Sequence, residues 1–250
     1  MAGSEPADPT AEALRFSIVV PVFNEGANIG AYCRELCRWA QPPYELLVVY
    51  DFDEDDTLPA LSALAQSDRP FIVRTVKNEL GRGVRNAIET GLRAARAPVV
   101  VVSMADLSDD LANLAELVRR AELGAAVVCA SRYARGGKQI GGPMVKALLS
   151  RAAGVSLHHL AGLPTADPTN SFKAYRRDFL ERTTIESTAG FCLALELTVK
   201  AHFRGLRVEE VPATWRDRVA GKSNFRLVKW FPHYLRWYLW AFQQRYLGGG

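Results

Sequence analysis

The sequence lacks a long hydrophobic run. None of its 250 residues belongs to an uninterrupted apolar stretch of eighteen or more, so we expect no membrane-spanning helix. The first residues are small and polar and include no apolar segment flanked by basic residues, so we expect no signal peptide. We predict that residues 1–14 form a disordered tail.

Cysteine is scarce and has no recognisable pattern. Cys33 and Cys37 are one helical turn apart, and Cys129 and Cys192 stand alone in apolar runs. No CxxC pair or metal-ligand spacing occurs. The pattern predicts four buried, reduced thiols in a cytosolic protein.

A large excess of one charge is also missing. The net charge of +4 is too small to indicate binding to nucleic acid, which we exclude as a partner. The distribution of charge is more informative. Acidic residues cluster at 51–56 and 106–110, whereas basic and aromatic residues gather after Arg216.

The chain has enough apolar residues for one core, at 48% hydrophobic and 23% charged. In its first half, short apolar segments alternate with segments of helical periodicity. The predicted strands are 16–22, 44–50, 71–75, 98–104 and 125–130. This alternation predicts an α/β fold, a doubly wound and mostly parallel sheet flanked by helices, in a single domain from 15 to 224.

Three polar or turn-forming residues follow these strands. Pro21, Asp51 and Asp106 all lie at predicted carboxyl ends. Ligands of parallel α/β sheets bind at that edge. The sequence therefore predicts a ligand site there without any knowledge of a family.

The second half has a different pattern. We predict a helix over 144–160, a helix over 191–203 and a strand over 207–215. Lys146 and Ser150 are one turn apart on the first helix and should share a face. Leu148, Leu149 and Ala152 are expected to give that helix its buried side.

The last segment, 225–250, combines Trp, Tyr and Phe with Arg and Lys. This composition favours an amphipathic helix in the headgroup layer of a membrane, with Trp230, Trp237 and Trp240 buried in the interface. The alternative is a terminal helix docked on the domain or on a second copy.

Eight segments occur in the order typical of one enzyme family. They are VVPVFNEGANI, VVYDFDEDDT, GRGVRNAIETGL, ADLSDD, ASRYARGG, TNSFKAYRRDFL, GFCLALEL and DRVAGKSNF, which cover roughly residues 16 to 226. The ordered set resembles the family 2 glycosyltransferases, most closely the branch of the dolichol-phosphate mannose synthases.

The resemblance implies a GT-A fold and an inverting transfer of a hexose. The donor would be a nucleotide-diphosphate sugar of the GDP-mannose or UDP-glucose type, and the acceptor a polyprenyl or dolichyl phosphate. It also implies a divalent cation, Mg²⁺ or Mn²⁺. Such an enzyme would be cytoplasmic and peripheral on the inner face of the membrane.

The resemblance implies functional roles for individual residues. Those matching donor-nucleotide contacts are Pro21, Val22, Asn24, Glu25, Asp51, Arg82, Ala105 and Asp106. Those matching acceptor-phosphate contacts are Arg132, Lys146, Ser150 and Arg218. Asp106 and Ser108 match metal ligands, and Asp106, Arg132 and Arg218 are the expected catalytic residues.

Two positions depart from the family pattern. Met104 stands where the family has the first acid of Asp-x-Asp, and Tyr50 stands where it has the first of two adjacent acids. A thioether is a poor ligand for a hard cation. We therefore expect a weakly held cation, with Asp109 as a substitute ligand or cationic side chains in its place.

Several residues keep an alternative interpretation. Asn24 and Glu25 suit a helix cap, as do Asp109 and Asp110. Glu196 is either a base or a buried acid paired with a neighbouring cation. His158 and His159 have no acidic partner in the sequence and are expected to be structural.

Three other functions remain open from the sequence. The protein could glycosylate a saccharide or protein hydroxyl, which would need a general base near Glu196. It could bind a nucleotide sugar without turnover, since Met104 weakens the metal motif. A nucleotidyltransferase would share the sheet, but no clear basic signature precedes the first helix.

Overall fold

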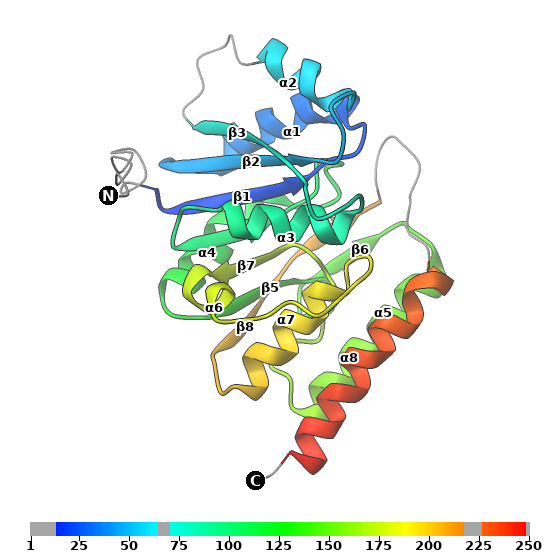
Figure 1. Cartoon of the computed structure of the whole chain (residues 1–250). Helices are drawn as coiled ribbons and strands as arrows, with labels where there is room; N and C mark the ends of the chain where they lie inside the picture. The colour runs from blue at the N-terminus through cyan, green and yellow to red at the C-terminus, as the bar shows by residue number, and fades with distance from the viewer. Residues whose placement is uncertain (1–13, 65–70, 218–226, 249–250) are drawn as a thin grey trace, which may run out of the picture.

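The computed structural model describes residues 14–64, 71–217 and 227–248 (Figure 1). A seven-stranded sheet of order β3-β2-β1-β4-β7-β5-β8 lies at its centre, and β6 and β9 form a separate pair. The strands are β1 (Phe16–Pro21), β2 (Tyr44–Tyr50), β3 (Ile72–Lys77), β4 (Val99–Val102), β5 (Val127–Ser131), β6 (Lys138–Ile140), β7 (Lys173–Arg176), β8 (Val208–Pro212) and β9 (Thr214–Arg216).

Helices connect the strands and cover both faces of the sheet (Figure 1). They are α1 (Gly26–Trp39), α2 (Thr57–Leu64), α3 (Val84–Ala94), α4 (Leu114–Glu122), α5 (Met144–Ala161), α6 (Arg177–Glu181), α7 (Cys192–Phe203) and α8 (Leu227–Leu247). Strand β7 runs antiparallel to β4 and β5, whereas the other pairs in this sheet are parallel. The predicted doubly wound, mostly parallel sheet is confirmed.

Alternate residues of the central strands enter two cores. Ile18 packs with α1 and α4 on one face, and Val19 packs with α3 and α7 on the other. Every residue of β1 is buried, because helices cover both sides of the strand. This double burial explains why the strands are continuous β-branched runs without a polar alternation.

The sequence prediction missed two strands and merged two others. The predicted strand 207–215 divides at Ala213 into β8 of the main sheet and β9 of the small one. Strands β6 and β7 have no apolar run, since β7 reads KAYR and its Lys173 is completely buried. A buried charged residue at a strand start conceals the strand from a search for hydrophobic segments.

The terminal helix α8 packs against α5 and α7 (Figure 1). Trp237 is only 2% exposed, and its Nε1 donates to Ser187 Oγ at 2.8 Å. Trp240 contacts the ring of Phe203, and Trp230 contacts that of Phe191. These contacts correct the expectation that the three tryptophans lie in a membrane interface, because they dock α8 on the domain.

Exposed apolar side chains occur instead on α5 and α8. Leu148 and Leu149 of α5 are 69% and 43% exposed, so the prediction that they form a buried side was wrong. The buried residues of α5, which are Gly154, Leu157 and Ala161, all lie in its second half. Exposed apolar residues also occur on α8, namely Phe231, Leu235 and Leu239.

Two further expectations can be compared with the fold. Cys37 is exposed rather than buried, because it lies at the edge of the α1 face that buries Cys33. All four thiols are free.

Of the predicted N-terminal tail, residues 1–13 lie outside the described residues, and Leu14 is buried. None of the described helices has the length and apolar character of a membrane span.

Two helical glycines differ in the room that a methyl group would have. A Cβ on Gly91 of α3 would lie 2.2 Å from Val19 Cγ1, whereas on Gly30 of α1 the nearest atom would be 3.7 Å away. We expect Gly91→Ala to destabilise the protein by about 1–3 kcal/mol through overpacking. Gly30→Ala should stabilise it by about 0.4–1 kcal/mol, because alanine restricts the unfolded chain. Urea denaturation of both variants checks the pair, and equal midpoints would contradict the close contact of α3 with the sheet.

Candidate active site

The predicted strand ends meet at one edge of the sheet. Strand β1 lies between β2 and β4 in parallel register, so Pro21, Asp51 and Ser103 follow neighbouring strands. The Ser103 N–H donates to Val19 O at 3.1 Å and continues the pairing beyond β4. The convergence that the sequence predicted for Pro21, Asp51 and Asp106 is therefore present.

Asp51 fixes the loop before α3. Its Oδ1 accepts from Asn78 Nδ2 at 2.6 Å, and its Oδ2 accepts from the Gly83 N–H at 2.8 Å. Gly83 has a φ of 128°, which strongly favours glycine. The guanidinium of the neighbouring Arg82 lies over the Phe52 ring at 5.2 Å. Asp51 thus positions a basic side chain at this edge of the sheet while keeping lone pairs for a ligand.

The start of α1 is capped by the acidic loop after β2. The backbone N–H groups of Asn24, Glu25 and Gly26 donate to Asp55, Thr57 and Asp56, at 3.1, 3.0 and 2.8 Å. The side chain of Glu25 makes no cap hydrogen bond and instead accepts from Asn28 Nδ2. The alternative that Asn24 and Glu25 themselves cap the helix was therefore wrong, and the side chains of Asp55, Asp56 and Thr57 do so.

Asp106 and Asp109 are two buried carboxylates in the segment that follows β4. Asp106 is 7% exposed, and its Oδ1 accepts from the Ser108 N–H at 3.1 Å. Asp109 Oδ2 accepts from the Met104 N–H at 3.1 Å, so this side chain turns back to the strand end. Burial, and next the charge of Asp106, raises the pKa of Asp109 to about 7. Of the two acids proposed as caps, Asp110 alone caps, accepting from the Ala112 N–H.

The residues after β4 offer hard oxygen ligands. Met104, Asp106, Ser108 and Asp109 line one cavity. Two carboxylates and a hydroxyl suit Mg²⁺ or Mn²⁺, whereas the thioether does not. Among the described residues, no three His, Cys, Asp or Glu side chains are grouped as a complete metal site. The residues fit a cation that takes its remaining ligands from a bound diphosphate.

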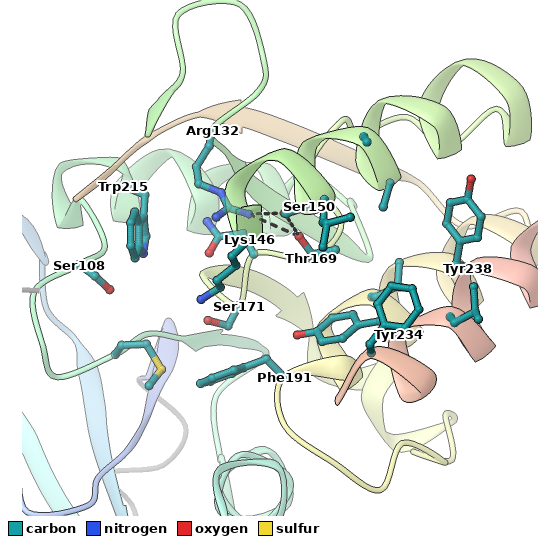
Figure 2. Close-up of a pocket in the computed structure, with 18 of the residues that line it drawn as sticks. Ser108, Arg132, Lys146, Ser150, Thr169, Ser171, Phe191, Trp215, Tyr234 and Tyr238 are labelled. Atoms are coloured by element: carbon teal, nitrogen blue, oxygen red, sulfur yellow. Dashed lines mark hydrogen bonds between the residues drawn. The ribbon is translucent and has the colours of Figure 1, made fainter. Parts of the chain in front are cut away.

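Arg132 lies at the end of β5 and is almost fully engaged. Its Nε donates to Asp167 Oδ2 at 2.7 Å and its Nη2 to Asp167 Oδ1 at 2.8 Å, a bidentate pair in which Asp167 is completely buried. Nη2 also donates to Ser150 Oγ at 3.0 Å (Figure 2). Asp167 keeps the pKa of Arg132 above its usual value despite burial. The ion pair therefore offsets the positive charge that the sequence assigned to phosphate binding.

Lys146 and Ser150 share one face of α5, as predicted, and both line the cavity. Ser150 Oγ lies 2.7 Å from Thr169 Oγ1, and these two hydroxyls flank the Arg132 guanidinium (Figure 2). The Lys146 amine points into the cavity (Figure 2). Arg218, the other predicted cation, lies outside the described residues.

Glu196 is a structural acid. It is completely buried and accepts from the Glu186 and Ser187 N–H groups at 2.6 and 2.8 Å and from Lys200 Nζ at 2.6 Å. Of its two alternatives, the buried pair is confirmed. His158 is structural too, since its Nδ1 lies 2.7 Å from Leu163 O.

The cavity measures about 550 Å³ and connects two kinds of surface. One end holds the carboxylates after β4 together with Arg132 and Lys146. The other end runs between α5 and α8 and is lined by apolar and aromatic side chains, among them Leu149, Phe231 and Leu235. A phosphate attached to a hydrocarbon chain has the same division between a charged and an apolar part.

Sequence reasoning missed several residues of this site. Asp167, Thr169 and Ser171 lie in the loop before β7, and Tyr234 lies on α8. A polar residue within the matched segment TNSFKAYRRDFL could have indicated Thr169 and Ser171. Nothing in the sequence pairs Asp167 with Arg132, which is 35 positions away.

Comparisons with known proteins agree with this geometry. The model of "Glycosyl transferase family 2" matches residues 17–184. Polyprenol monophosphomannose synthase of Mycolicibacterium smegmatis is 34% identical over 231 residues, which are 89% of this chain and 85% of that protein. Dolichol-phosphate mannosyltransferase of Pyrococcus furiosus is 26% identical over 235 residues, 87% of this chain and 64% of that protein.

A solved structure shares the fold. Glucosyl-3-phosphoglycerate synthase of Mycobacterium tuberculosis, in complex with Mn²⁺, UDP and glucosyl-3-phosphoglycerate, superposes with a TM-score of 0.65 at 19% identity, over 98% of this chain and 86% of that chain. The predicted GT-A fold is thereby confirmed. With the family model and the relative at 34% identity, the sheet and its site show that the chain belongs to glycosyl transferase family 2 and is a glycosyltransferase.

Proposed function

We propose that the protein transfers a hexose from a nucleotide-diphosphate sugar to a polyprenyl phosphate at a membrane surface, with inversion at the anomeric carbon. The cavity carries this proposal, because one continuous space joins buried carboxylates, the Lys146 amine and an apolar groove between α5 and α8. The names of the two relatives, a polyprenol monophosphomannose synthase and a dolichol-phosphate mannosyltransferase, support the acceptor class.

The donor would lie at the carboxyl ends of β1, β2 and β4. The residues assigned to it are Pro21, Val22, Asn24, Glu25, Asp51, Arg82, Ala105 and Asp106. Asp51 holds the Arg82 loop in place, and Arg82 is suited to an anionic diphosphate. A cation bound by Asp106 and Ser108 would offset the negative charge that develops on the leaving diphosphate.

The acceptor phosphate would lie between Asp106 and Lys146, with its isoprenyl chain in the groove. A phosphate oxygen attacks the anomeric carbon, the bond from this carbon to the diphosphate oxygen breaks, and its electron pair leaves with the nucleoside diphosphate. A phosphate monoester is already largely ionised at neutral pH, since its second pKa is about 6. The step therefore needs positioning more than a base, which agrees with the structural role of Glu196.

The need for a general base distinguishes transfer to a hydroxyl group from the proposed transfer to a phosphate. A hydroxyl acceptor requires a general base, and Glu196, the candidate from the sequence, is locked by three donors away from the cavity lining. Incubating the protein with GDP-mannose or UDP-glucose, with a polyprenyl phosphate or the matching polyprenol, tests the proposal. Product from the phosphate alone is expected, and product from the polyprenol alone would overturn it.

Asp106→Asn should abolish transfer, because it removes a carboxylate from the position of the leaving diphosphate. Asp110→Asn is the matched control, since Asp110 caps a short helix and is absent from the cavity lining. It should keep both the stability and the turnover, because asparagine caps a helix about as well as aspartate does. Product formation and circular dichroism check the pair. Turnover of Asp106→Asn at the parental rate would exclude Asp106 from the reaction.

Met104→Asp should strengthen the binding of Mn²⁺, because it adds a carboxylate beside Asp106 where a thioether now stands. Met104→Leu keeps the apolar volume and should leave the affinity unchanged. Calorimetric titration with Mn²⁺ in the presence of the nucleoside diphosphate compares the three proteins. Equal affinities would show that the cation is held by other residues.

The exposed apolar residues of α5 and α8 should bind a lipid surface. We expect the double variant Leu148→Glu/Leu239→Glu to lose at least tenfold in vesicle binding, because each leucine contributes about 1.5–3 kcal/mol when it leaves water. Leu123→Glu is the control, since Leu123 is 59% exposed and follows α4. Co-sedimentation with anionic vesicles measures the effect. Equal binding of both variants would refute a membrane role for these two helices.

A further inference from the structure

Helix α8 contributes a polar group to the acceptor end of the cavity. Tyr234 lines the cavity, and its ring packs against the cluster that contains Leu157, Leu195 and Trp237. Its hydroxyl points inward, into the space that the Lys146 amine also enters (Figure 2). The packed ring therefore presents the hydroxyl from a fixed position.

The Tyr234 hydroxyl has a weak partner within the protein. The Cys192 thiol is the side chain that interacts with this hydroxyl, and sulfur is a poor hydrogen-bonding atom. Burial holds the pKa of Tyr234 well above its usual value, and Arg132 opposes this shift by its charge. The group thus stays protonated and can donate to a better acceptor, such as a phosphate oxygen.

We infer that Tyr234 donates a hydrogen bond to the phosphate of the acceptor, so that α8 completes the active site as well as covering it. The inference rests on the proposed function, which places a phosphate in this cavity. It also follows from the state of Arg132. The bidentate pair with Asp167 occupies Nε and Nη2, and Nη2 also donates to Ser150, so Nη1 is the nitrogen with donor capacity left for a ligand, and another donor is needed to hold a phosphate.

The next tyrosine on the helix provides an internal comparison. Tyr238 lies one turn after Tyr234 and also lines the cavity. Its hydroxyl lies 3.0 Å from Ser156 Oγ of α5, so it joins the two helices. Tyr238 is therefore satisfied by a protein partner, and the same substitution at both positions separates a ligand contact from a packing contact.

The experiment compares Tyr234→Phe with Tyr238→Phe in the full chain. The acceptor is a short-chain, water-soluble isoprenyl phosphate, which removes any effect of membrane binding. A hydrogen bond to a charged group is strong enough that Tyr234→Phe should raise the KM for this acceptor about tenfold or more. The KM for the donor should not change. Tyr238→Phe should keep both KM values. The loss of its hydrogen bond to Ser156 should lower the melting temperature instead.

A second measurement does not depend on turnover. Titration calorimetry with the same isoprenyl phosphate, without donor, should show a weakened affinity for Tyr234→Phe and a parental affinity for Tyr238→Phe. An acceptor KM for Tyr234→Phe within twofold of the parental value, or equal changes in both variants, would overturn the inference and leave the proposed function intact. A parental enzyme that neither binds nor glycosylates the isoprenyl phosphate would overturn the proposed function itself.

Discussion

The buried ion pair between Arg132 and Asp167 determines how the proposed acceptor side of the site is built. It connects the end of β5 to the loop before β7, and through Ser150 and Thr169 it reaches α5. Lys173 Nζ donates to the Asp167 backbone carbonyl at 3.3 Å beneath the same loop. Removing one partner would leave a buried charge unpaired, which typically costs about 3–5 kcal/mol. The pair therefore supports the cavity, and its own charges largely cancel.

A second polar network fixes the opposite wall. Glu196 on α7 accepts from the backbone N–H groups of Glu186 and Ser187, and Lys200 donates to the Glu186 carboxylate. The Ser187 hydroxyl then accepts from the indole N–H of Trp237. The ammonium of Lys200 lies 4.8 Å from the centre of the Trp237 ring, a cation–π contact. Helix α8 is therefore attached to the domain by specific bonds as well as by apolar packing. The position of Tyr234 follows from this attachment.

The sheet and one edge of the site could be predicted because they depend on local signals. Doubly buried strands leave continuous apolar runs, and their carboxyl ends place Asp51 and Asp106 at one edge. The missing parts depend on contacts that no local pattern records. Lys173 is charged and buried, and Asp167 meets Arg132 from a distant loop. Leu149 is apolar but exposed, because the buried residues of α5 lie in its second half. In the aromatic segment, composition could not show which ring would turn inward.

The apolar outward surface and the inward tyrosines belong to the same rigid helix. Tyr234 and Leu239 lie five residues apart on α8, a rise of about 7.5 Å along its axis. Because both residues belong to one helix, the distance between a surface that contacts Leu239 and the Tyr234 hydroxyl is fixed. Under the proposed function, the distance from an anchored phosphate to the carboxylates after β4 would be set by the geometry of this one helix rather than by the length of a flexible linker.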